Sequence, residues 1–85
     1  MATAPQHRTP EGFVLTEVQQ DLWGRVTMYQ VDGTRYFLTR TPTGWRAQIA
    51  PHGKARRRYV GPGWEGPLQC VRYLSRYGYL RPESP

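Results

Sequence analysis

The sequence predicts an α+β fold, in which a small antiparallel sheet of four to five strands forms a β-meander and one C-terminal helix packs on one of its faces. Short runs rich in β-branched and aromatic residues occupy positions 13–60 and are separated by turn motifs. Apolar residues at helical spacing follow them. A chain of 85 residues has room for one hydrophobic core. We therefore expect a single domain over residues 12–81, between flexible tails at residues 1–11 and 82–85.

The first predicted strand covers residues 13–18, where apolar and polar residues alternate weakly. Residues 19–24 form a turn or a short helical connection, and Trp23 is expected to anchor this connection in the core. The next two strands, residues 25–31 and 34–40, are again rich in β-branched and aromatic residues.

The dipeptide Asp32-Gly33 between these two strands is a strong hairpin motif, because both residues of the corresponding turn need positive φ. A two-residue turn would set the register by pairing Val31 with Thr34, Gln30 with Arg35, Tyr29 with Tyr36, Met28 with Phe37 and Thr27 with Leu38.

A second turn at residues 41–44 leads into a strand at residues 45–50, where apolar and polar side chains alternate cleanly. A four-residue loop would place the apolar residues of neighbouring strands on one face. That predicted core face holds Tyr29, Tyr36, Leu38, Trp45, Ala47 and Ile49. The opposite face would hold Gln30, Arg35, Arg46 and Gln48, with Met28 and Phe37 among them.

A third turn at residues 51–54 precedes a strand at residues 55–60, whose register is ambiguous because no strong turn motif sets the loop length. We favour the register with Arg57 and Tyr59 on the core side, since it keeps Arg56 and Arg58 on the polar face and avoids burying two arginines. A shift of one residue would exchange these pairs. The following Gly-Pro-Gly at residues 61–63 is expected to break the sheet.

The helix is predicted to begin at Pro67, a residue well suited to the first helical position, with Gly66 before it. Gly78 is a natural C-terminal stop. Tyr79 and Leu80 would then fold back onto the core. The positions that recur at helical spacing are Leu68, Val71, Leu74 and Tyr77 or Gly78.

Charge is distributed very unevenly along the chain, whose net charge is +6. Residues 34–81 carry ten of the twelve basic residues and a single acid, whereas residues 1–33 carry two basic residues and four acids. A cationic field on one folded segment attracts polyanions, and nucleic acid is the commonest of these.

We therefore expect a small bacterial or phage protein that binds double-stranded DNA through an arginine-bearing sheet face. Arginine pairs with guanine and glutamine with adenine in the major groove, which accepts a small sheet. Lys54, in the turn before the strand at residues 55–60, would reach phosphate. The predicted contact residues are Arg35, Arg46, Gln48, Lys54, Arg56 and Arg58.

Catalytic and metal sites are poorly supported by the sequence. His7 and His52 have no ligands at metal-binding spacing, and Cys70 falls among apolar helix residues, as a packed thiol would. The pair Glu17 and Asp21 has no nucleophile or base beside it. We expect no enzyme activity, no cofactor, no metal and no small-molecule substrate. A single cysteine and no apolar run of membrane-spanning length favour a cytoplasmic protein, nucleoid-associated if it binds DNA.

Residues 44–77 resemble the three-strand-plus-helix DNA-binding modules of the plant AP2 type and of phage-integrase arm-binding domains. The resemblance lies in Trp-Arg-Ala-Gln-Ile at residues 45–49, a turn, Arg-Tyr-Val-Gly at residues 58–61, and then a helix. It implies that the exposed sheet face reads the major groove through Arg46, Gln48, Arg56 and Arg58. The Gly-Pro-Gly-Trp segment before the helix departs from the AP2 pattern, as does the lack of an alanine-rich helix face.

Two alternatives stay open. The strands could close into an SH3-like or OB-like barrel that binds single-stranded RNA or DNA, with tyrosines stacking on bases. The chain could instead be a protein-interaction module, such as a phage-encoded inhibitor or a small subunit of a complex, with a patch of Met28, Phe37, Tyr79 and Leu80.

Overall fold

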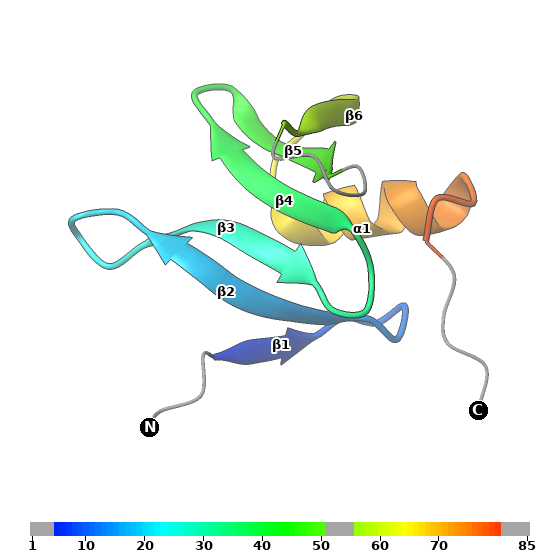
Figure 1. The fold of residues 1–85 in the computed structure, drawn as a ribbon, viewed down its shortest axis with the longest axis horizontal. Coiled ribbons are helices and arrows are strands. Elements are labelled where there is room, and N and C mark those ends of the chain that lie inside the picture. The colour runs from blue at the N-terminus through cyan, green and yellow to red at the C-terminus, as the bar shows by residue number, and fades with distance from the viewer. Residues whose placement is uncertain (1–4, 51–55, 81–85) are drawn as a thin grey trace.

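A computed structural model describes residues 5–50 and 56–80 and contains, over those residues, one six-stranded antiparallel sheet and one helix (Figure 1). The order in the sheet is β1-β2-β3-β4-β5-β6, so every strand pairs with its neighbours in the chain. The predicted α+β meander with a C-terminal helix is confirmed, with six strands rather than four to five. Their bounds are β1 Gln6–Arg8, β2 Val14–Gln20, β3 Val26–Val31, β4 Tyr36–Thr41, β5 Gly44–Ile49, β6 Arg58–Trp64 and α1 Pro67–Arg76.

Strand β1 lies within the segment expected to be a flexible tail, so that expectation is wrong for residues 6–8. Arg8 pairs with Val14 of β2, and the short connection closes on Thr9, which is only 3% exposed. The Thr9 N–H donates to the Phe13 carbonyl (2.8 Å), and the Phe13 N–H donates to Thr9 Oγ1 (3.1 Å). These paired hydrogen bonds stabilise an edge strand whose hydrophilic sequence carries no strand signal. The predicted tail at residues 82–85 lies outside the described residues.

The hairpin of β2 and β3 ends in a turn whose hydrogen bonds converge on Asp21. Asp21 Oδ1 accepts the N–H groups of Trp23 and Arg25, each at 2.9 Å, and Oδ2 accepts Arg25 Nε at 3.0 Å. Desolvation alone would raise the pKa of Asp21, but these hydrogen bonds lower it overall. The Trp23 side chain is 77% exposed, so the prediction that it anchors in the core is wrong.

The hairpin of β3 and β4 has a register two residues away from the predicted one, because Tyr29 pairs with Leu38. Only Gly33 of the Asp-Gly pair has positive φ (+76°), and Thr34 closes a longer loop. Thr34 Oγ1 donates to the Val31 carbonyl (2.7 Å) and accepts the N–H of Tyr36 (3.0 Å). A shift of two residues keeps every side chain on its predicted face, since side chains alternate with a period of two.

The hairpin of β4 and β5 has the predicted register, with Arg40 opposite Trp45 and Leu38 opposite Ala47. The predicted core face is therefore confirmed for five of its six residues, whereas Ile49 lies on the same side of the sheet but is only partly buried. Leu38 and Ala47 are buried in the core, and the aromatic residues Tyr29, Tyr36 and Trp45 pack against it.

Strand β6 differs from the prediction in extent and in register. It continues through the Gly-Pro-Gly segment to Trp64, so that segment does not break the sheet. Val60 pairs with Ala47 on the core face, while Tyr59 pairs with Gln48 on the opposite face. The favoured register is therefore wrong by one residue. The reason is the hydrophobic effect, since burying Val60 removes a fully apolar side chain from water, whereas Tyr59 and Arg57 keep polar groups exposed.

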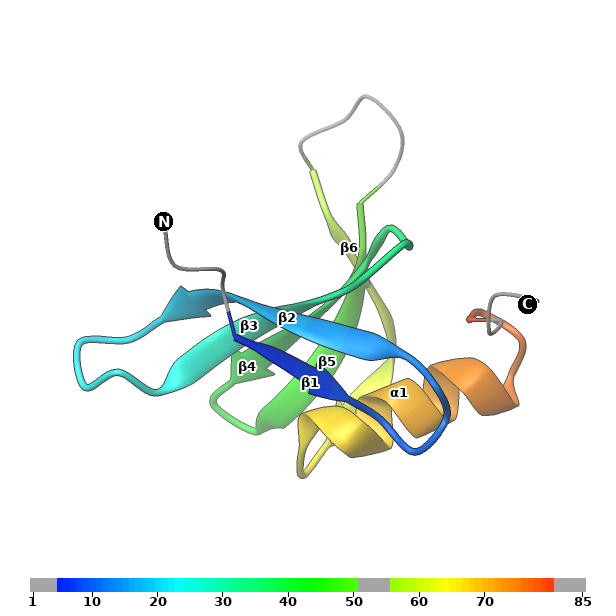
Figure 2. The same ribbon diagram turned by 90° about the horizontal axis from the view of Figure 1, so that it is seen from below.

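Helix α1 begins and ends as predicted, at Pro67 after Gly66 and before Gly78. The Gly78 N–H donates to the Ser75 carbonyl (3.2 Å) and the Tyr79 N–H to the Leu74 carbonyl (2.9 Å), which is the Schellman arrangement that satisfies the last carbonyls of a helix. The helix lies on one side of the sheet, against β4, β5 and β6 (Figure 2). The buried core comprises Phe13, Leu15, Val31, Leu38, Ala47, Cys70, Val71, Leu74 and Leu80.

Two predicted core positions of the helix, Leu68 and Tyr77, are instead 46% and 63% exposed. Cys70 takes a core position in their place.

In the part of the chain that the structure describes, no helix is long and apolar enough to cross a membrane.

Candidate nucleic-acid interface

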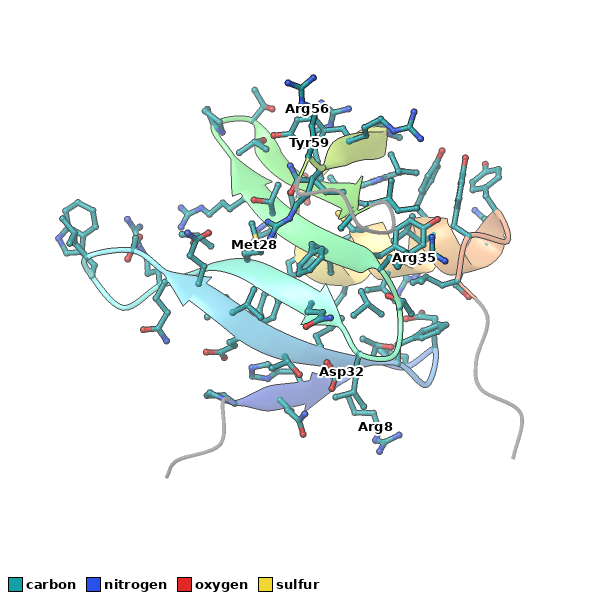
Figure 3. The ribbon with its side chains drawn as sticks, viewed as in Figure 1. Arg8, Met28, Asp32, Arg35, Arg56 and Tyr59 are labelled. Atoms are coloured by element: carbon teal, nitrogen blue, oxygen red, sulfur yellow. The ribbon has the colours of Figure 1, made fainter. Side chains whose placement is uncertain are left out.

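The side of the sheet opposite α1 presents two rows of side chains that cross the strands, and we call this surface the helix-free face. One row runs from Gln30 through Phe37 and Gln48 to Tyr59, since these residues pair in register. The other runs from Met28 through Thr39 to Arg46. Met28 and Tyr59, one residue from each row, are labelled in Figure 3. With Arg57, the helix-free face comprises Met28, Gln30, Phe37, Thr39, Arg46, Gln48, Arg57 and Tyr59.

Arg46 of β5 is held against β6 by two contacts. Its guanidinium carbon lies 4.1 Å from the ring centroid of Tyr59, and Nη2 donates to the Gly61 carbonyl at 3.0 Å. A cation over an aromatic face is attracted by the ring quadrupole, by about 0.5–1 kcal/mol at exposed sites. Tyr59 itself is 49% exposed. The pair therefore presents a partly open ring next to an immobilised positive charge.

Arg57 forms the matching pair on the other side of Gln48. Its guanidinium carbon lies 4.3 Å from the ring centroid of Phe37 on β4, and Nη1 lies 3.1 Å from Met28 Sδ on β3. The Arg57 side chain thus crosses over β5 to reach two further strands. The N–H···S contact is a weak hydrogen bond, so little opposes the movement of this arginine toward a stronger acceptor.

Two buried polar atoms of the helix-free face have no hydrogen-bond partner in the described part of the chain. Gln48 Oε1 and Arg46 Nε are buried and have no hydrogen-bond partner among the described residues. A buried polar atom without a partner costs about 1–3 kcal/mol. A ligand that drew Arg57 or Arg46 aside and bonded to these atoms would recover that energy.

The β1 end of the same side has a different character. Asp32 accepts hydrogen bonds from Thr16 Oγ1 (2.6 Å) and from Gln6 Nε2 (3.1 Å). Thr16 pairs with Gln30, so this acidic network borders the helix-free face. The positive charges lie at the β5 and β6 end, which makes that end the favourable one for a polyanion.

The structure brings together some of the residues predicted from the sequence and separates others. Arg46 and Gln48 lie side by side on the helix-free face. Arg58 pairs with Ile49 and so belongs to the side that α1 occupies, and Arg56 is exposed ahead of β6. Arg35 is exposed in the loop before β4, and Lys54 lies outside the described residues.

The favoured register missed two residues of the helix-free face, Arg57 and Tyr59. The apolar Val60 next to Tyr59 was the available signal, because an aliphatic residue competes better than tyrosine for a core position.

Other chemistry is weakly supported in the described part of the chain. Burial raises the pKa of the Cys70 thiol to about 12, and Sγ donates to the Trp45 carbonyl (3.4 Å), so the thiol stays protonated at neutral pH. Within residues 5–50 and 56–80, no group of three or more His, Cys, Asp or Glu side chains could hold a metal ion.

A scan against protein-family models finds no match for this chain, and searches of curated proteins and of solved structures find none either. The resemblance to AP2-type and integrase arm-binding modules therefore stays a prediction.

Proposed function

We propose that this protein binds nucleic acid through the helix-free face and that it takes unpaired strands in preference to duplex DNA. The observation that carries the proposal is the row Phe37–Gln48–Tyr59, in which each ring is covered by a guanidinium group. The role is one of binding rather than catalysis.

Each component of this row matches one part of a nucleotide. Bases stack on aromatic rings regardless of sequence, with a gain of about 1–3 kcal/mol per base. Guanidinium groups form charge-assisted hydrogen bonds with phosphate oxygens. The amide of Gln48 can bond to the edge of an unpaired base. Arg46 and Arg57 would exchange their intramolecular contacts for phosphate, which leaves the rings of Tyr59 and Phe37 open for bases.

The sequence alone favoured binding of duplex DNA, but the arrangement of the side chains on the helix-free face supports it less well. Groove recognition needs side chains that protrude to base edges. Arg58 belongs to the other side of the sheet, and Arg56 lies ahead of β6. The observed register places Arg57 and Tyr59 on the helix-free face where Arg56 and Arg58 were predicted, so a stacking group replaces one arginine. This exchange favours single strands.

A protein-interaction patch is less favoured as well. Leu80 is only 3% exposed, and Tyr79 packs with Tyr36 of the core face at a ring-centroid distance of 6.3 Å. Met28 and Phe37 lie on the other side, under Arg57. The four residues therefore do not form one surface.

The proposal is tested by fluorescence anisotropy with single-stranded DNA, single-stranded RNA and duplex DNA of equal length, at about 50 mM and 200 mM salt. The adjacent arginines 57 and 58 provide a matched pair, because each substitution removes one exposed positive charge from a different side of β6. We expect Arg57→Ala to weaken single-strand binding about tenfold, the loss of one charge-assisted bond, and Arg58→Ala to change it about twofold.

Tyr59→Ala should weaken single-strand binding as much as Arg57→Ala does, since stacking and charge both contribute. Equal loss in the Arg57 and Arg58 variants would mean that only net charge matters and would contradict a site on the helix-free face. Tighter binding of duplex DNA, with Tyr59→Ala unaffected, would replace the single-strand proposal with the duplex one.

A further inference from the structure

A cavity of about 400 Å³ opens on the other side of β6, between that strand and α1. Its size falls within the range of small-ligand sites. One wall is a single stripe of the helix, with residues spaced i, i+3, i+4, i+7 and i+8, and this stripe lies beside the one that faces the core. The lining residues are Pro62 and Trp64 from β6, Gln69, Arg72, Tyr73 and Arg76 from α1, and Tyr77 at the C-cap of α1.

Three aromatic rings form the apolar part of this cavity. Trp64 and Tyr73 have ring centroids 5.6 Å apart with an interplanar angle of 43°, and Tyr73 and Tyr77 are 4.8 Å apart at 43°. Tyr77 is 63% exposed, so the ring cluster is open to a ligand on that side. A planar ring could stack against such a cluster, as bases stack on aromatic side chains.

The position of the central ring depends on Gly61. A Cβ atom at that residue would lie 2.5 Å from Tyr73 Cε1, so only glycine lets the tyrosine ring approach the β6 backbone this closely. Backbone packing at Gly61 therefore sets the position of the central ring of the cavity.

The polar part of the lining is cationic. Arg72 and Arg76 are one turn apart on α1, and none of the seven lining residues is acidic. Arg72 Nε also lies 3.7 Å from Glu11 Oε2, which orients its side chain. Arg76 has no acidic partner within 4.0 Å among the described residues. Two neighbouring guanidinium groups suit a phosphate dianion, and the Gln69 amide adds a neutral donor and acceptor.

We propose that this cavity binds a nucleoside monophosphate, with the base against Trp64, Tyr73 and Tyr77 and the phosphate on Arg72 and Arg76. The ligand could be a free nucleotide or the 5′-phosphorylated end of a strand, because both present the same ring and dianion. The site is a ligand site in a chain for which the sequence predicts no small-molecule substrate. It does not rest on the proposed function, because it lies on the α1 side and shares no residue with the helix-free face.

Isothermal titration calorimetry of the full chain tests this inference with the four ribonucleoside 5′-monophosphates, the matching nucleosides, and ribose 5-phosphate. We expect monophosphates to bind with a Kd below about 1 mM, and nucleosides and ribose 5-phosphate to bind at least tenfold more weakly, since each has half of the recognised groups. A short oligonucleotide with a 5′-phosphate, compared with the same strand ending in a 5′-hydroxyl, separates the two sources of ligand.

Variants at exposed lining positions show whether the binding heat in the calorimetric titration comes from the cavity. Arg76→Ala should weaken monophosphate binding about tenfold, with partial recovery in Arg76→Lys, and Tyr77→Ala should weaken both nucleoside and monophosphate binding. Arg40→Ala is the control, because Arg40 is exposed, carries the same charge and does not line the cavity. Far-UV circular dichroism checks that each variant is folded.

Absence of monophosphate binding at about 1 mM, or equal loss of binding in the Arg76→Ala and Arg40→Ala variants, would overturn the inference. Arg57→Ala should lose binding of single strands and keep binding of monophosphates. This result would show that the helix-free face and the cavity can be tested independently.

Discussion

The placement of β6 can be tested by substitution of a single glycine. Gly61 has φ of +76°, and a Cβ atom there would lie 2.5, 2.9 and 3.2 Å from three atoms of the Tyr73 ring. A left-handed backbone costs a non-glycine residue about 1–2 kcal/mol. Forcing an extra carbon into a packed contact costs about 1–3 kcal/mol. We therefore expect Gly61→Ala to lower the free energy of unfolding by about 2–5 kcal/mol.

Gly24 is the matched control for this substitution. Its φ of +79° is nearly the same, and a Cβ atom there has nothing within 4 Å. Gly24→Ala should thus carry the backbone cost alone, about 1–2 kcal/mol. The difference between the two variants measures the contact with Tyr73. Urea unfolding followed by far-UV circular dichroism gives both values. The slope of the free energy of unfolding against urea concentration shows whether the unfolded state has changed.

If the two substitutions lowered the free energy of unfolding equally, the Tyr73 ring of α1 would not lie against Gly61 of β6, and this packing would be refuted. The same result would remove one of the two contacts that support the observed register of β6, the other being that of Val60 with Ala47. A second check is Gly61→Ala combined with Tyr73→Ala, in which the steric part of the penalty should disappear.

Three further predictions concern the core. Cys70 should resist a thiol reagent at about pH 8 in the native protein and react on unfolding, because burial raises its pKa to about 12 from 9.0. The raised pKa also means that stability from this thiol is present below pH 9.0 and is lost as pH rises toward about 12, which pH-dependent urea unfolding should detect as a fall that Cys70→Ala lacks. Leu38→Ala should lower the free energy of unfolding by about 2–5 kcal/mol, since Leu38 is fully buried, and an unchanged urea midpoint would contradict its place in the core.

Much of the fold could be predicted because the signals for it are local. Alternation with a period of two assigned Leu38 and Ala47 to the core face, and a two-residue error in the hairpin register left that assignment intact. Pro67 and Gly78 marked the helix ends through their own backbone preferences. The candidate site was predicted in part, with Arg46 and Gln48 on the helix-free face.

The errors arose where local signals are weak or compete. Strand β1 is three polar residues long and exists through pairing with β2 and the hydrogen bonds of Thr9. Trp23 was assigned to the core from its size, but Asp21 holds the turn so that this ring stays exposed. Both outcomes depend on contacts that composition and periodicity do not describe.

Local patterns in the sequence are enough to predict a basic α+β meander, most of its core face and both helix ends, because side-chain alternation and glycine and proline geometry act over a few residues. Local patterns do not show which arginine of the run 56–58 joins the helix-free face. That choice depends on Val60 packing against Ala47 and on Tyr73 lying over Gly61, two contacts between segments far apart in the chain. A one-residue shift reverses every side chain of a strand, so these two contacts determine the composition of the candidate site.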